Sequence, residues 1–171
     1  LHMGDLVTGY GDELIIAWIQ NWIIHALFIN PLGLFDANLF YPYNNTLAYS
    51  DLHLTSSILS IIPLLIIGQP IATFNFTLLS SLVLVPFSIF LLSWNLTKNY
   101  LASLLSGILV LFAPAFLDKK VHVQILALEW IPLSILFFIL FHKKKKTRYL
   151  VVSMFFFLLQ TYNSFMPGYF L

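Results

Sequence analysis

Residues 11–53 read GDELIIAWIQNWIIHALFINPLGLFDANLFYPYNNTLAYSDLH, and their composition differs from that of the rest of the chain. This stretch holds four of the seven acidic residues and two of the four Trp residues, together with a segment dense in Tyr, Asn and Pro. The chain after residue 53 is a series of apolar segments typical of membrane helices. We therefore expect the chemistry of the protein in residues 11–53 and its membrane anchor after them.

The composition of the whole chain is that of a membrane protein. Of 171 residues, 60% are hydrophobic and 9% are charged, whereas a soluble domain carries about 25% charged residues. The net charge of +1 gives no reason to expect a nucleic-acid partner. The absence of Cys excludes disulfides, a thiolate nucleophile and a Cys-based zinc site.

The ends of the chain predict a fragment of a longer polytopic protein. Residue 1 is Leu, no signal peptide is recognisable, and the last residues stop inside an apolar segment. We expect at least one further span before residue 1 and truncation at both ends. The predicted organisation is an outer loop with amphipathic helices over 1–69 and transmembrane helices over 70–171.

Residues 12–29 are predicted to form an amphipathic helix. Its apolar arc consists of Ile15, Ile16, Ile19, Trp22, Ile23, Ala26 and Leu27, and its polar arc of Glu13, Ala17, Gln20, Asn21 and His25. The polar arc favours a helix that lies in the membrane interface, with Trp18 and Trp22 as anchors. Asp12 is expected to be its N-cap.

Residues 34–50 are aromatic and rich in turn formers, which predicts an ordered loop outside the membrane. Asp51 is expected to cap the apolar segment 52–67. That segment either lies in the interface or forms one arm of a re-entrant hairpin; we favour two interfacial helices flanking an outer loop.

Four clearer membrane segments are predicted at about 71–94, 100–117, 124–142 and 149–166. The basic run Lys143–Lys146, with Arg148, is expected in the cytoplasm by the positive-inside rule. Alternation then predicts the 95–99 turn inside, the 117–123 loop outside and the acidic stretch outside.

Glu129 is the acidic residue inside a predicted membrane segment, where carboxylates are costly unless they pair or function. One interpretation pairs it with Lys119 or Lys120. In a second interpretation, Glu129 and His122, which lies seven residues earlier, share one face of a continuous helix. The motifs of soluble enzymes, such as a P-loop or G-x-S-x-G, are absent.

Three runs resemble a group of prokaryotic multi-spanning proteins placed with the GT-C glycosyltransferases, the class that includes protein O-mannosyltransferases and oligosaccharyltransferases. These runs are GDELIIAWIQNWIIHAL, LFDANLFYPYNNTLAYSD and HVQILALEWIPL. In two places the chain departs from the group: Asp51 stands where Glu is usual, and Glu129 where Gln is usual. The resemblance implies an all-α transmembrane bundle with interfacial amphipathic helices in the first outer loop.

It also implies a reaction and a site. A sugar would pass from a polyprenyl-phosphate donor to a glycan, lipid or protein acceptor outside the membrane. Asp12, at the start of the first outer loop, would be the catalytic base or a ligand of a divalent metal, with Asp51 as a second acidic group. The predicted substrate contacts are His122, Gln124, Glu129, Tyr41, Tyr43 and Tyr49; His122 would contact the donor phosphate and the Tyr rings would stack on sugars.

Two non-enzymatic classes remain as alternatives. A transporter or flippase component should show internal repeats and helices broken within the membrane. No repeat is apparent in the sequence, although Pro63, Pro86 and Pro114 permit kinks. A structural subunit of an envelope assembly would leave the acidic, aromatic loop unexplained.

Overall fold

The fold is that of a computed structural model, which describes residues 3–4, 11–114 and 122–170. The described residues form helices and no strand. In chain order the elements are α1 (Asp12–Ile29), the 3-10 helices η1 (Pro31–Gly33) and η2 (Thr46–Tyr49), α2 (Leu54–Leu59), α3 (Ile61–Ile67), α4 (Ile71–Thr97), α5 (Tyr100–Leu111), α7 (Val123–Leu126), α8 (Trp130–Lys144), α9 (Thr147–Asn163) and α10 (Phe165–Tyr169).

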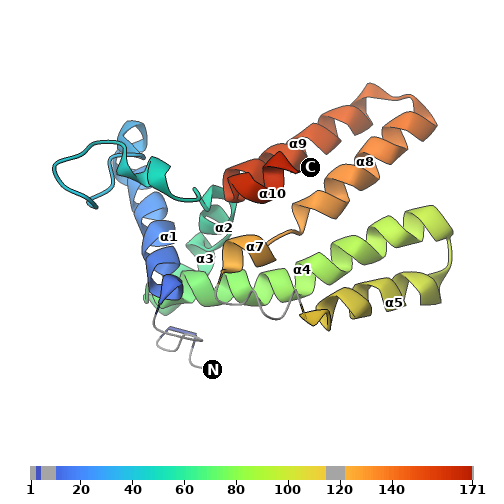
Figure 1. The fold of residues 1–171 in the computed structure, drawn as a ribbon, viewed down its shortest axis with the longest axis horizontal. Helices are drawn as coiled ribbons and strands as arrows, with labels where there is room; N and C mark the ends of the chain where they lie inside the picture. Colours follow the sequence, from blue (N-terminus) through green and yellow to red (C-terminus); the bar gives the residue numbers. More distant parts are fainter. Residues whose placement is uncertain (1–2, 5–10, 115–121, 171) are drawn as a thin grey trace.

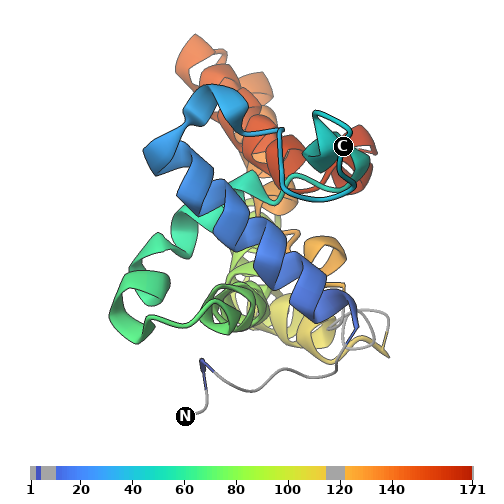
Figure 2. The ribbon, with the colours of Figure 1, turned by 90° about the vertical axis from the view of Figure 1, so that its left-hand side faces the viewer.

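Two helical hairpins, α4–α5 and α8–α9, extend in the same direction and place their turns at one end of the molecule (Figure 1). α1 and the loop after it lie at the opposite end. In Figure 2 the start of α4 is seen end-on while α1 runs across it, so α1 lies crosswise over the bundle.

With the exception of Glu129, the Asp, Glu, Lys and Arg residues of the described chain lie at these two ends. The Lys and Arg residues lie at the two hairpin turns: Lys98 follows α4, and Lys143–Lys146 with Arg148 join α8 to α9. Asp12 and Glu13 lie at the start of α1, and Asp36 and Asp51 in the segment after it. The 95–99 and 143–148 turns therefore lie at the same end, as alternation along the sequence predicts.

Three helical segments of the described chain are long and apolar enough to cross a membrane: α1, α4 and the segment Val123–Lys144 that contains α7 and α8. These segments are consistent with an integral membrane protein. α5 and α9 are shorter, with 12 and 17 residues. Within the predicted 100–117 segment α5 ends at Leu111, and residues 115–121 lie outside the described part.

α1 has the predicted bounds, but its polar arc faces the protein rather than water. Gln20 is fully buried and donates from Nε2 to Thr77 Oγ1 at 2.9 Å. Asn21 donates from Nδ2 to Thr73 Oγ1 at 3.1 Å. The expectation of a solvated polar arc is therefore wrong except at His25, which is exposed; the hydroxyl groups of α4 replace water as its partners.

Both predicted N-caps are also wrong. α1 begins after Gly11, whose ψ of −116° departs from the usual extended cap, and Asp12 is the first helical residue. The Glu13 carboxylate accepts from the Gly11 N–H at 3.2 Å. Asp51 accepts from the N–H of Phe165, the first residue of α10, at 3.0 Å. α2 begins only at Leu54, after His53 in the left-handed region at φ 51°.

The 52–67 segment forms two short helices, α2 and α3, that meet at Ser60. Neither is long enough to cross a bilayer. α2 is fixed to the end of α9: the Ser56 hydroxyl donates to Asn163 Oδ1 at 2.6 Å, and the His53 N–H donates to the Asn163 carbonyl oxygen at 2.9 Å. The segment therefore folds back against the bundle as a bent pair of helices.

His53 lies at this junction and is 1% exposed. Burial lowers the pKa of its imidazole from 6.5 to about 4, although the negative charge of Asp51 acts in the opposite direction. His53 is therefore neutral in the folded protein at pH 7.

The predicted 124–142 segment is interrupted. α7 ends at Leu126, and α8 begins at Trp130. The Leu128 N–H donates to the Leu126 carbonyl oxygen at 2.9 Å instead of continuing the α-helical pattern. His122 precedes α7 and Glu129 follows the break, so the expectation that they share one face of a continuous helix is wrong.

Candidate functional site

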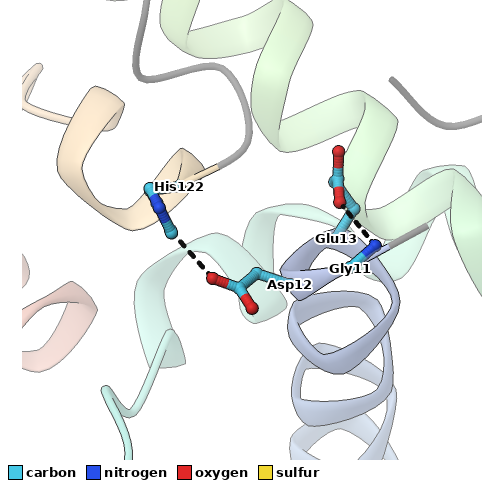
Figure 3. Close-up of polar contacts among 4 residues, drawn as sticks. All are labelled: Gly11, Asp12, Glu13 and His122. Atoms are coloured by element: carbon cyan, nitrogen blue, oxygen red, sulfur yellow. Dashed lines mark hydrogen bonds and ion pairs between the residues drawn. The ribbon is translucent and has the colours of Figure 1, made fainter. Parts of the chain in front are cut away.

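Two of the predicted site residues meet at the start of α1. Asp12 Oδ2 lies 3.1 Å from Nδ1 of His122, which immediately precedes α7 (Figure 3). Both side chains are partly open to solvent, with exposed fractions of 54% for Asp12 and 41% for His122. The pair is therefore accessible to a ligand, and one nitrogen of the imidazole and one oxygen of the carboxylate are outside the contact.

Apolar packing holds α7 in the position that brings His122 to Asp12. Val123 and Leu126 of α7 are buried in a cluster with Ile16 of α1 and Phe74 of α4. Burying side chains of this size contributes about 1.5–3 kcal/mol each. The contact between Asp12 and His122 is thus set by a core that joins three helices.

A largely apolar groove of about 760 Å³ lies between α1 and the loop after it. Its lining residues are Leu14, Ile15, Trp18, Ile19, Leu39, Phe40, Tyr43, Thr46, Leu47, Tyr49 and Ser50. Asp12 precedes Ile15 by three residues, and residues three apart lie on the same side of a helix. Asp12 is thus on the side of α1 that carries Ile15, although neither Asp12 nor His122 is among the lining residues of the groove.

The aromatic residues predicted to bind sugar divide into two sets. Tyr43 and Tyr49 line the groove, and Tyr49 packs on Phe40 with ring centroids 6.1 Å apart. Tyr41 is 95% exposed and is not among the lining residues. The sequence prediction missed Leu14, Ile15 and Trp18 as groove residues, because their helical spacing indicates only an apolar face.

The remaining predicted site residues lie apart from the Asp12–His122 contact. Asp51 is engaged at the start of α10. Gln124 lies on α7, and its Oε1 is buried without a hydrogen bond among the described residues. Glu129 is 3% exposed and lies in the break between α7 and α8. Lys119 and Lys120, its predicted partners, lie outside the described residues.

The side chains at this contact do not match the divalent metal implied by the resemblance. Such an ion takes about six oxygen or nitrogen ligands, usually with more than one carboxylate. Asp12 and His122 supply two candidate ligands, but no group of three or more His, Asp or Glu that could hold a metal occurs within the described ranges. These residues do not form a metal site on their own.

No family model, curated protein sequence or solved structure matches this chain.

Proposed function

We propose that the chain belongs to a multi-pass membrane glycosyltransferase of the GT-C type, with its acidic loop on the extracytoplasmic side of a prokaryotic membrane. The enzyme moves a sugar from a polyprenyl-phosphate donor to a glycan, lipid or protein acceptor. The observation that carries this proposal is the Asp12–His122 contact, made from the same helix, α1, that forms one wall of an apolar groove. Such a site offers polar groups to a phosphosugar and an apolar wall to the lipid beside it.

The contact divides the chemistry between two side chains. Asp12 takes the proton of the acceptor hydroxyl as that oxygen forms its bond to the anomeric carbon of the sugar. The bond from the anomeric carbon to the phosphate oxygen breaks, and the electron pair leaves with the polyprenyl phosphate. The His122 imidazole donates from Nδ1 to Asp12, and its Nε2 is the group left to face the departing phosphate oxygen. Tyr43 and Tyr49 provide aromatic faces on which a sugar ring stacks.

The test is transfer from a polyprenyl-phosphate-linked radiolabelled sugar in membranes that contain the protein. We expect D12N to lower the rate by about 10²-fold or more, with unchanged protein abundance. L32A is the control, because Leu32 is 99% exposed and lies outside the groove. Equal rates for the wild type and D12N would contradict the proposal.

One observation favours the second candidate, a transporter or flippase component without transferase activity. The helical segment 123–144 is broken, and a buried carboxylate lies at the break, as in many secondary transporters. Flux of a lipid-linked sugar across proteoliposomes without release of polyprenyl phosphate would identify this function. Release of polyprenyl phosphate that depends on Asp12 would identify the transferase.

A further inference from the structure

Glu129 is a buried carboxylate whose charge is not balanced by a described neighbour. It is 3% exposed, and its Oε2 forms no hydrogen bond within the described residues. No ion pair to it occurs within residues 11–114 and 122–170. A buried carboxylate without a positively charged partner costs several kcal/mol, so a group that supplies positive charge is expected beside it.

Other oxygen atoms without donors lie at the same break. The Ser81 side chain of α4 lies beside the Glu129 carboxyl group, near enough for its hydroxyl to donate weakly to that group, and it has no other hydrogen bond among the described residues. Gln160 of α9 is fully buried and donates from Nε2 to the Ala127 carbonyl oxygen at 3.1 Å. Its Oε1 has no hydrogen bond among the described residues. α4 and α9 thus bring a hydroxyl oxygen and an amide oxygen to the segment between α7 and α8 that carries Glu129.

The break between α7 and α8 also changes the pattern of backbone hydrogen bonds. In a continuous helix the Gln124 carbonyl oxygen would accept from the Leu128 N–H, but that N–H donates to the Leu126 carbonyl oxygen. Interrupted helices with free carbonyl oxygens and a buried acidic residue are the sites at which membrane proteins bind small cations.

We propose that the break between α7 and α8 binds a monovalent alkali cation, with Glu129, Ser81 and Gln160 as its side-chain ligands. Hard cations take oxygen ligands of these types, namely carboxylate, hydroxyl and amide oxygen. One carboxylate supplies one negative charge, which balances a monovalent ion, whereas divalent ions are usually held by more carboxylates. The site is distinct from the Asp12–His122 pair and stands whichever of the two candidate functions is correct.

The experiment measures the thermal unfolding midpoint of the purified protein in detergent as NaCl replaces choline chloride at constant ionic strength. Sodium that binds the folded state raises the midpoint, and the rise increases with the ratio of Na⁺ concentration to Kd. We expect this rise in the wild type and its loss in E129Q, which keeps the size of the side chain. E129D keeps the charge with a shorter reach, and it should need about tenfold more Na⁺ for the same rise.

S81A and S88A form a matched pair on α4. Ser88 is also buried, but its hydroxyl donates to the Val85 carbonyl oxygen at 2.8 Å within the same helix. We expect S81A to weaken the Na⁺ response and S88A to keep it. Equal midpoints of the wild type in Na⁺ and choline would overturn the proposal, as expected if a proton or Lys119 or Lys120 neutralises Glu129. An unchanged Na⁺ response in E129D and S81A would overturn it as well, even if E129Q failed to fold.

Discussion

Asp12 Oδ2 and His122 Nδ1 lie 3.1 Å apart (Figure 3). Asp12 is the first residue of α1, whereas His122 immediately precedes α7, so the contact joins distant parts of the sequence. A pair that acts as one unit gives non-additive losses of activity when its members are replaced singly and together. We expect D12N and H122N each to lower the rate of sugar transfer strongly, and the double variant to be little worse than the more damaged single one. Rates that multiply, measured in the same membrane assay, would show that the residues act independently.

Asp51 allows the role of its charge to be separated from its role as a cap. Because Asn also offers a side-chain oxygen to the Phe165 N–H, D51N should keep the thermal stability of the wild type, whereas D51A should lose about 1 kcal/mol. The sequence predicts a catalytic carboxylate, so D51N should also lose transfer activity. Full transfer activity of D51N would show that the negative charge of Asp51 is not needed for catalysis and that the residue only caps α10.

The stability of the protein should fall as the pH is lowered from about 6.5 to 4, because of His53. The pKa of His53 is lowered in the folded state, so between these pH values the imidazole is protonated in the unfolded chain but not in the folded protein. Proton binding to the unfolded chain therefore shifts the folding equilibrium toward unfolding. The loss from this group is about 3 kcal/mol at most, from a shift of 6.5 to about 4. Thermal unfolding of the wild type and H53Q at several pH values measures it, and H53Q should show a flatter dependence. Parallel pH curves for the two proteins would contradict the assignment to His53.

The sidedness of the two ends can be tested by cysteine labelling, since the chain has no native Cys. Asn44 and Lys146 are both exposed and avoid the left-handed backbone found at Asn45 and Lys145. In intact cells we expect an impermeant maleimide to label N44C and not K146C. Lysed cells provide the control, because both positions should then react. Labelling of K146C alone in intact cells would place the acidic end in the cytoplasm and remove the support for an extracytoplasmic transferase.

Gly107 of α5 lies against the backbone of α4. A Cβ atom on Gly107 would lie 2.8 Å from the Pro86 carbonyl oxygen, which is closer than packing allows. We expect G107V to lower the free energy of unfolding by about 1–3 kcal/mol. A102V, on the exposed face of the same helix, is the matched control. Equal midpoints of thermal unfolding for the two variants would show that the helices separate at no cost.

The sequence predicted the helices well and their partners poorly. The bounds of α1 and the start of α4 are set by local signals, namely the Gly before Asp12 and the Pro before Ile71. In HVQILALEWIPL, Pro132 is a local signal for a helix that begins nearby, because its ring disfavours a continuous helix through Leu128. The sequence does not give the geometry of the break before Trp130. Its geometry depends on Gln160 donating to the Ala127 carbonyl oxygen, a contact across 33 positions of the chain.

For the candidate site, too, the sequence indicated the residues but not the contacts between them. The residue types at Asp12 and His122 marked them as candidates, but only the folded core around Phe74 brings them together. Asp51 and Asp12 were both expected as caps of their own helices, because Asp before an apolar run favours that role. In the structure each makes its contact with a distant segment instead, which a local pattern cannot reveal.

The inward polar face of α1 sets an order of events during synthesis of the protein. Gln20 hydrogen-bonds to Thr77, which leaves the ribosome 57 residues later. Until α4 is made, the amide of Gln20 must stay hydrated, because a polar side chain without a partner is costly in lipid. The polar face of α1 is therefore more stable in water than in lipid until α4 supplies its hydroxyl partners.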